Sequence, residues 1–247
     1  MARYDFRTPR LLVEAPLAEG AQIALDRSQT NYLVNVLRLA PGAPVLVFNG
    51  RDGEWRASVA PASKRAVALA VAQQVRAQTA PGDLHYLFAP LKHARLDYMV
   101  QKAVEMGVSR LTPVLTRHGQ VSRVNLGRMR SNAIEAAEQC GILSLPAIDE
   151  PVALDALIAA WTPSRLMVLC DEDADVTDPV AALARSRAAA PVSVLIGPEG
   201  GFAVEERAAL MKLPNVIRLS LGPRILRADT AAVAVLALVQ AVLGDWR

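Results

Sequence analysis

Two glycine-containing loops near the C-terminus hold the residues best suited to chemistry. They follow short apolar runs that end at residues 196 and 221, and each precedes a pattern typical of a helix. In open α/β sheets, ligands bind outside the carboxyl ends of the strands, where such loops gather. Two of them so close in sequence therefore predict one ligand site that both help to build.

The first loop, residues 197–202, reads G-P-E-G-G-F. Its glycines let the main chain approach a ligand or adopt positive φ, and its proline stiffens the turn. Glu205 and Glu206 begin the next helix, where they would repel a phosphate. Because the loop matches neither the dinucleotide fingerprint nor a P-loop, a ligand of low negative charge is favoured over a triphosphate. Taken alone, the loop could also be a plain tight turn.

The second loop, residues 222–227, reads G-P-R-I-L-R and brings two arginines to the same edge. Asp229 or Thr230 could then cap the final helix. Since Arg227 lies between a leucine and an apolar helix, its guanidinium needs a partner, such as Glu199, Asp229 or a ligand oxygen. A buried arginine–carboxylate pair and a direct catalytic role both remain open.

The sequence lacks the residue patterns needed for nucleophilic hydrolysis or for a metal-dependent mechanism. The three histidines, His85, His93 and His118, lie outside both loops, and no Ser-His-Asp spacing is present. The two cysteines, Cys140 and Cys170, give neither a disulfide framework nor metal-ligand spacing, and we expect both to be buried thiols. No metal is therefore expected, and the chemistry that remains depends on positioning two substrates.

The composition is typical of a globular protein, and we expect it to be neither secreted nor inserted in a membrane. The chain has 247 residues, of which 52% are hydrophobic and 21% charged, and its net charge is +3. The first 76 residues hold ten Lys and Arg against six Asp and Glu, and residues 92–130 form a second basic stretch. These stretches suit a polyanion such as RNA, or an ordinary solvated surface. No leader follows Met1, and the apolar stretch 231–239 falls short of the ~20 residues of a membrane span, so a cytoplasmic location is expected.

The chain divides near residue 75 into two parts of different pattern. Strand patterns at 43–48, 54–59 and 66–71, with a helical spacing over 32–39, predict a small β-barrel domain in residues 1–75. In residues 76–247, apolar strands alternate with helical patterns, which predicts a mainly parallel sheet covered by helices. These strands are expected at 84–89, 110–116, 166–170, 192–196 and 216–221. The last helix is apolar almost all round, so it should be buried or pressed against another subunit.

Five ordered motifs resemble one known family along nearly the whole chain. Residues 196–201 and 221–231 are similar to the motifs I-G-P-E-G-G and L-G-x-R-I/V-L-R-x-E/D-T-A of the bacterial 16S ribosomal RNA uridine N3-methyltransferases, which belong to the SPOUT superfamily. Residues 101–108, 135–141 and 32–38 resemble that family's Q-K-x-x-E-L-G-V, E-A-x-E-Q-C-G and Y-L-x-x-V-L-R segments. Departures from the family's pattern occur at Asn31, Asn49, His93, Ala203 and Asp229.

The resemblance implies a PUA-like barrel over residues 1–75 and an α/β domain with a deep trefoil knot over residues 76–247. It also implies a homodimer that binds S-adenosylmethionine and methylates N3 of a uridine in 16S ribosomal RNA, either as free RNA or within the small ribosomal subunit. Two other functions stay open, a ribose 2′-O-methyltransferase of the same fold and a non-catalytic RNA-binding assembly factor.

The resemblance also suggests roles for single residues. Arg227 would stabilise the charge that develops on the uracil, while Glu199 or Asp229 orients it or takes the N3 proton. The cofactor would contact Gly197, Pro198, Gly201, Leu219, Ser220, Leu221, Gly222, Leu226 and Thr230. Contacts with RNA phosphates would come from Arg7, Arg10, Arg38, Lys92 and Arg95.

Overall fold

The computed structural model describes residues 5–63, 66–175, 178–186 and 191–246, which form two compact units. The first unit contains the chain up to residue 80 together with residues 134–145. The second contains residues 81–133 and the chain from residue 146 onward. The chain therefore leaves the first unit, returns to it once, and leaves it again.

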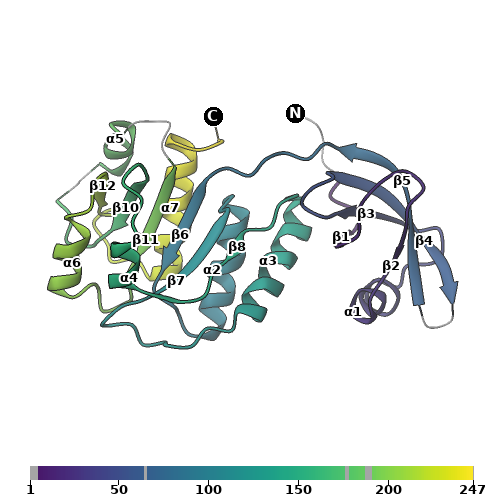
Figure 1. Ribbon diagram of the computed structural model, residues 1–247, viewed down its shortest axis with the longest axis horizontal. Helices are drawn as coiled ribbons and strands as arrows, with labels where there is room; N and C mark the ends of the chain where they lie inside the picture. Colours follow the sequence, from purple (N-terminus) through teal and green to yellow (C-terminus); the bar gives the residue numbers. More distant parts are fainter. Residues whose placement is uncertain (1–4, 64–65, 176–177, 187–190, 247) are drawn as a thin grey trace. The chain divides into compact units, whose positions relative to one another are not determined.

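The first unit is a curled five-stranded sheet with one short helical segment (Figure 1). Its strands run in the order β1-β3-β4-β5-β2, in which β1 is parallel to β3 and the other pairs are antiparallel. Apolar side chains of these strands, such as Val45 and Leu69, form one core together with Leu33 of the helical segment. The strands are β1 (Arg10–Leu12), β2 (Gln22–Ala24), β3 (Pro44–Phe48), β4 (Glu54–Ser63) and β5 (Ala66–Arg76).

Polar side chains define the turns of this unit. The carboxylate of Asp26 accepts a hydrogen bond from the N–H of Gln29 and so begins α1 (Arg27–Asn31), which continues into a π-helical turn over Tyr32–Val36. The predicted hairpin between β3 and β4 is confirmed. Its turn is held by Asn49, whose Oδ1 accepts from the N–H of the residues two and three positions further on.

The second unit is an all-parallel sheet covered by helices on both faces (Figure 1). The main path of the sheet has the order β12-β10-β11-β6-β7-β8, and β9 pairs with β7. The strands are β6 (Leu84–Phe88), β7 (Arg110–Leu115), β8 (Ala147–Ile148), β9 (Val152–Ala153), β10 (Leu166–Cys170), β11 (Val192–Ile196) and β12 (Val216–Leu219). The helices are α2 (His93–Glu105), α3 (Leu126–Cys140), α4 (Leu154–Ala159), α5 (Pro179–Ala184), α6 (Val204–Leu210) and α7 (Ala228–Val242). Residues 134–140 of α3 belong to the first unit.

Both faces of this sheet are buried, which explains its continuous apolar strands. On one face, Leu87, Met167 and Leu195 pack with Leu154 of α4 and Leu210 of α6. On the other face, α2 and α7 pack against each other, and α7 also contacts β11. There the Tyr86 hydroxyl donates to the sulfur of Met99 in α2.

The fold class predicted from the sequence, an α/β domain with a mainly parallel sheet preceded by a small β domain, is confirmed. Periodicity missed the short elements β1, β2, β8, β9, α4 and α5, which contain two to six residues each. The expected burial of Cys140 is wrong, because this residue is exposed near the end of α3. Among the described residues, no helix has both the length and the apolar character to span a membrane.

Candidate active site

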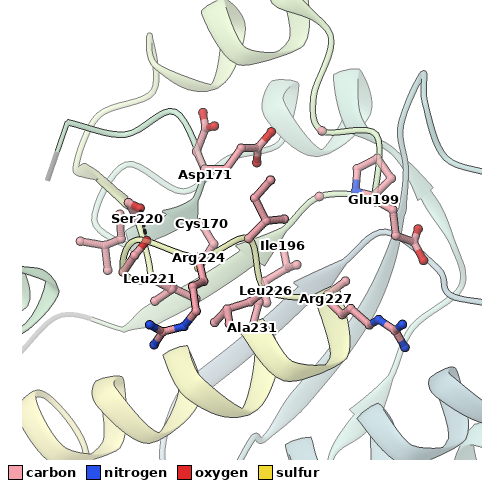
Figure 2. Close-up of a pocket in the computed structure, with 18 of the residues that line it drawn as sticks. Cys170, Asp171, Ile196, Glu199, Ser220, Leu221, Arg224, Leu226, Arg227 and Ala231 are labelled. Carbon is pink, nitrogen blue, oxygen red and sulfur yellow. Dashed lines mark hydrogen bonds between the residues drawn. The ribbon is translucent and has the colours of Figure 1, made fainter. Parts of the chain in front are cut away.

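A pocket of about 580 Å³ opens at the carboxyl ends of three neighbouring strands, β10, β11 and β12 (Figure 2). Because all three strands are parallel, the segments that follow them meet at one edge of the sheet. Both glycine loops line this pocket. The sequence therefore predicted its position correctly, while the contribution of β10 was missed.

Eight of the nine residues expected to contact a cofactor line the pocket, and Thr230 does not. Gly201 and Gly222 adopt φ values of +69° and +94°, which side chains other than glycine rarely permit. β12 ends at Leu219, so Ser220 and Leu221 belong to the connecting segment and not to the strand. The segment is thus free to turn its main chain toward the pocket.

Two of the three expected catalytic residues, Arg227 and Glu199, also line the pocket, while Asp229 does not. The expected burial of Arg227 is wrong, because this residue is exposed and makes no contact with a carboxylate in the described parts of the chain. The expected caps are wrong as well. Arg227 itself occupies the N-cap position of α7, and Asp229 lies in the first turn. The Arg227 guanidinium is therefore available to a ligand (Figure 2).

The carboxylate of Glu199 forms an ion pair with Arg95 of α2. Its Oε1 lies 3.5 Å from Nη1 of Arg95, and both side chains are more than 40% exposed. The two residues are 104 positions apart in sequence, and this pairing was not predicted. Arg95 was expected to contact RNA, and its position beside the pocket is compatible with that role as well.

Asp171, directly after β10, is the main site residue that the sequence analysis missed. It lines the pocket, and its side chain is completely buried between two arginines. Its Oδ2 lies 2.7 Å from Nε of Arg207 and 2.9 Å from Nε of Arg218. A buried carboxylate requires such partners, so this cluster fixes the end of β10 against α6 and β12. The acidic run that begins at position 171, at the end of a predicted strand, was the available signal.

Cys170 and Glu172 flank this carboxylate and also line the pocket. Burial raises the pKa of the Cys170 thiol to about 12, so the thiol stays protonated at neutral pH and does not act as a nucleophile. Asp171, Glu172 and Asp173 are close enough to share a cation, but Arg207 contacts all three. The arginine already supplies the positive charge there.

One histidine lies against the first loop, contrary to the expectation from sequence. His118, in the turn after β7, places its Nδ1 3.3 Å from the carbonyl oxygen of Gly200 and 3.2 Å from that of Gly201. The separation of 82 residues between His118 and Gly200 made this contact invisible to a search by sequence proximity.

The residues expected to contact RNA differ in their surroundings. Arg7, Arg38 and Lys92 are exposed, and Arg38 has a φ of +55°. Arg10 is buried, and its Nε donates to Oε1 of Glu54 at 2.8 Å while Nη2 donates to the carbonyl oxygen of Asp5. The expectation that Arg10 contacts a phosphate is therefore not supported, because its guanidinium is occupied within the first unit.

The pocket has the features needed to hold a nucleoside-like ligand. Ile196, Leu219 and Phe202 form apolar walls. Within the described residues, the main-chain N–H groups of Leu221 and Leu226 donate no hydrogen bond, so they are available to a ligand. Its volume falls in the range of small-molecule sites, roughly 300–1,000 Å³. The residues present therefore fit S-adenosylmethionine, whose adenosine part is uncharged and carries a flat adenine ring.

This fold and this pocket together define a cofactor-binding α/β enzyme with its site at a sheet edge. The chain belongs to the RNA methyltransferase family. A family model described as an RNA methyltransferase domain matches residues 78–240, and a model described as an RNA methyltransferase PUA domain matches residues 25–71. The N-terminal unit is thus PUA-like, as the resemblance implied.

Similar proteins match along nearly the full length of the chain. Ribosomal RNA small subunit methyltransferase E of Rickettsia conorii is 28% identical over 232 residues, which cover 94% of each chain. The protein of the same name from Synechocystis is 29% identical and covers 95% of this chain and 78% of its own.

Two solved structures are similar to this chain over nearly its whole length. A putative methyltransferase from Legionella pneumophila, in complex with S-adenosylmethionine, is 29% identical, with a TM-score of 0.80 and coverage of 95% of this chain and 98% of its own. Ribosomal RNA small subunit methyltransferase E of Neisseria gonorrhoeae, bound to the same cofactor, has a TM-score of 0.87 at 22% identity and covers 98% and 100%. This second likeness shows that the two proteins share a fold.

Proposed function

We propose that this enzyme transfers a methyl group from S-adenosylmethionine to N3 of a uridine in 16S ribosomal RNA. The observation that carries the proposal is the pocket built by the two glycine loops, with Arg227 and Glu199 on its lining. The family assignment and the names of the full-length relatives support the RNA substrate. The cofactor bound in the Legionella structure supports S-adenosylmethionine.

When bound, the cofactor supplies an electrophilic methyl group on a sulfonium. The chain's contribution is to enclose this group and to hold the uracil in line with it. Apolar residues such as Ile196 and Leu219 exclude water from one side of the pocket, and the free main-chain groups of Leu221 and Leu226 orient the adenosine part. Gly201 and Gly222 permit this close approach of the main chain.

The target nitrogen carries a proton that must leave as the new N–C bond forms and the sulfur retains the electron pair of the broken S–C bond. Negative charge then grows on the oxygens of the uracil ring. The exposed guanidinium of Arg227 would stabilise that charge, because it has no competing carboxylate in the described structure. Glu199, oriented by Arg95, would accept the proton. Asp229 lies outside the pocket lining, so we assign it no direct contact.

The division of labour follows the two units. We propose that residues 1–75 hold RNA and that residues 76–247 carry the transfer, with phosphate contacts from Arg7, Arg38, Lys92 and Arg95. Such a protein works in the compartment that contains ribosomal subunits, the cytoplasm.

We also propose a homodimer, because Val233, Ala234, Ala237 and Leu238 leave a partly exposed apolar face on α7. Analytical ultracentrifugation should give twice the chain mass of 26.5 kDa.

The decisive experiment offers labelled S-adenosylmethionine to unmodified small ribosomal subunits and to naked 16S RNA, followed by mass spectrometry of the nucleosides. N3-methyluridine is the expected product, and the preferred substrate shows when in assembly the enzyme acts. A ribose 2′-O-methyl product would replace the proposal with the alternative enzyme. Cofactor binding without transfer would indicate another RNA, and absence of both would favour a non-catalytic RNA-binding protein.

A further inference from the structure

The turn after β7 forms hydrogen bonds with the first glycine loop, on the side of the loop away from the pocket. His118 places one ring nitrogen, Nδ1, against two consecutive carbonyl oxygens, at 3.3 Å from Gly200 and 3.2 Å from Gly201. A carbonyl oxygen can only accept a hydrogen bond, so Nδ1 must carry the hydrogen. The tautomer of His118 is therefore set by the loop, and Nε2 is the nitrogen that remains without hydrogen when the ring is neutral.

Further contacts keep the ring of His118 in this position. The N–H of Arg117 donates to Oε1 of Glu206 in α6 at 2.8 Å, and the N–H of Gly119 closes the turn onto the carbonyl oxygen of Thr116. A Cβ atom built on Gly200 would lie 3.4 Å from Cβ of His118, so the loop and the turn are in van der Waals contact. The turn thus acts as a fixed support for the loop.

This support determines which way one peptide group of the loop faces. In a planar trans peptide, the C=O and the following N–H point in opposite directions. The carbonyl of Gly201 points toward His118, which does not line the pocket, whereas Gly201 and Phe202 both do. The N–H of Phe202 therefore points away from His118. Phe202 is 6% exposed, and its N–H has no acceptor within the described residues.

A buried N–H without an acceptor destabilises a protein unless a ligand supplies one. We propose that His118 is a positioning residue of the cofactor site: it holds the Gly201 carbonyl outward, and this presents the Phe202 N–H to a hydrogen-bond acceptor of S-adenosylmethionine. The acceptor is a ring nitrogen, a hydroxyl or a carboxylate oxygen of the cofactor. This inference rests on the proposed function and adds a residue to it that does not touch the cofactor.

Four variants test the inference by the affinity for S-adenosylmethionine, measured by isothermal titration calorimetry. His118→Ala removes the donor and should weaken binding roughly fivefold, as expected for one hydrogen bond. His118→Asn places an amide N–H₂ where Nδ1 lies and should bind within about twofold of the unmodified protein. His118→Gln places its amide one bond further out and should resemble the alanine variant. Arg117→Ala is the matched control, because the Arg117 side chain contacts only an exposed Glu205, and binding should not change.

Amide hydrogen exchange gives a second readout that needs no catalysis. In the unmodified protein, S-adenosylmethionine should slow exchange at Phe202, and this protection should be reduced in His118→Ala and restored in His118→Asn. Equal affinity of His118→Ala and the unmodified protein would overturn the inference while leaving the proposed function intact. Equal loss in the Ala and Asn variants, at unchanged thermal stability, would also overturn it. Failure of the unmodified protein to bind the cofactor would instead reject the proposed function, and the inference with it.

Discussion

The guanidinium of Arg95 and the carboxylate of Glu199 join the first turn of α2 to the loop after β11, with 3.5 Å between Nη1 and Oε1. Both side chains are more than 40% exposed, so the pair contributes at most about 1 kcal/mol to stability. Its effect is to orient a carboxylate on the pocket lining. This separation of orientation from stability gives the first test of the mechanism.

Glu199→Gln should lower the rate of single-turnover methylation by roughly 100-fold, because the amide keeps the shape but cannot accept the N3 proton. The affinity for S-adenosylmethionine and the melting temperature should stay near those of the unmodified protein. Arg95→Ala is the companion variant and should have a smaller effect on the rate. A rate for Glu199→Gln within twofold of normal would show that another group takes the proton.

Arg227→Ala should reduce the single-turnover rate by roughly 100- to 1,000-fold, the usual cost of losing one group that stabilises developing negative charge. Arg227→Lys keeps the charge without the planar donor array, so it should recover part of the rate. Because Arg227 is exposed, unfolding by urea should be nearly unchanged in both variants. Unaltered methylation by the alanine variant would remove Arg227 from the mechanism.

Asp171→Asn should destabilise the second unit by about 3 kcal/mol, since it leaves Arg207 and Arg218 without their buried carboxylate. Urea unfolding measures this loss. Asp173→Asn is the control, because Asp173 contacts the same Arg207 but its side chain is 64% exposed. Equal effects of the two substitutions would contradict the importance assigned to burial at position 171.

His85 predicts a loss of stability at mildly acidic pH. Burial, reinforced by Arg110 and Arg165, lowers the pKa of His85 from 6.5 to about 4. Below pH 6.5 His85 therefore becomes protonated in the unfolded chain but stays neutral in the folded protein. The free energy of unfolding falls by up to about 3 kcal/mol as the pH drops to 4. His85→Gln retains a donor to Thr112 without titrating, so the difference between its stability and that of the unmodified protein should vary over this range. A constant difference would contradict the shift.

Glu138 predicts the opposite dependence in the first unit. Burial is the main cause that raises its pKa from 4.5 to about 7, with Glu135 adding to the effect. The protonated carboxyl stabilises the fold at low pH, and this stability is lost as the pH rises through 7. Glu138→Gln should therefore be more stable than the unmodified protein at pH 8, by up to about 3 kcal/mol, with little difference at pH 4. Chemical unfolding at the two pH values checks this, and a gain at both would argue for another cause.

Local patterns predicted the elements and the place of the pocket, because both depend on short-range signals. Short, mainly apolar runs predicted β10 and β11, and glycine at positions 201 and 222 marked the loops where φ is positive. The trefoil knot was expected only from the family resemblance, since no periodicity encodes the path of a chain through a loop.

Long-range pairing is what the sequence analysis could not supply. The pairs Arg10 with Glu54 and His118 with Gly201 join residues 44 and 83 positions apart, and neither partner is unusual in its own segment. The burial of Arg227 was also predicted wrongly. Its apolar neighbours in sequence suggested burial, but the loop turns its side chain outward. Side-chain partners become predictable only after strand order is known.

Because residues 134–145 belong to the first unit, this unit cannot be completed early in the synthesis of the nascent chain. Glu138 accepts a hydrogen bond from the N–H of Leu12, and the carbonyl oxygen of Gly141 accepts one from Arg76, so the N-terminal strands lack these partners until α3 has been synthesised. The part of the protein made first is thus completed only after more than half of the chain has left the ribosome, and a fragment that stops at residue 80 would lack the segment that closes it.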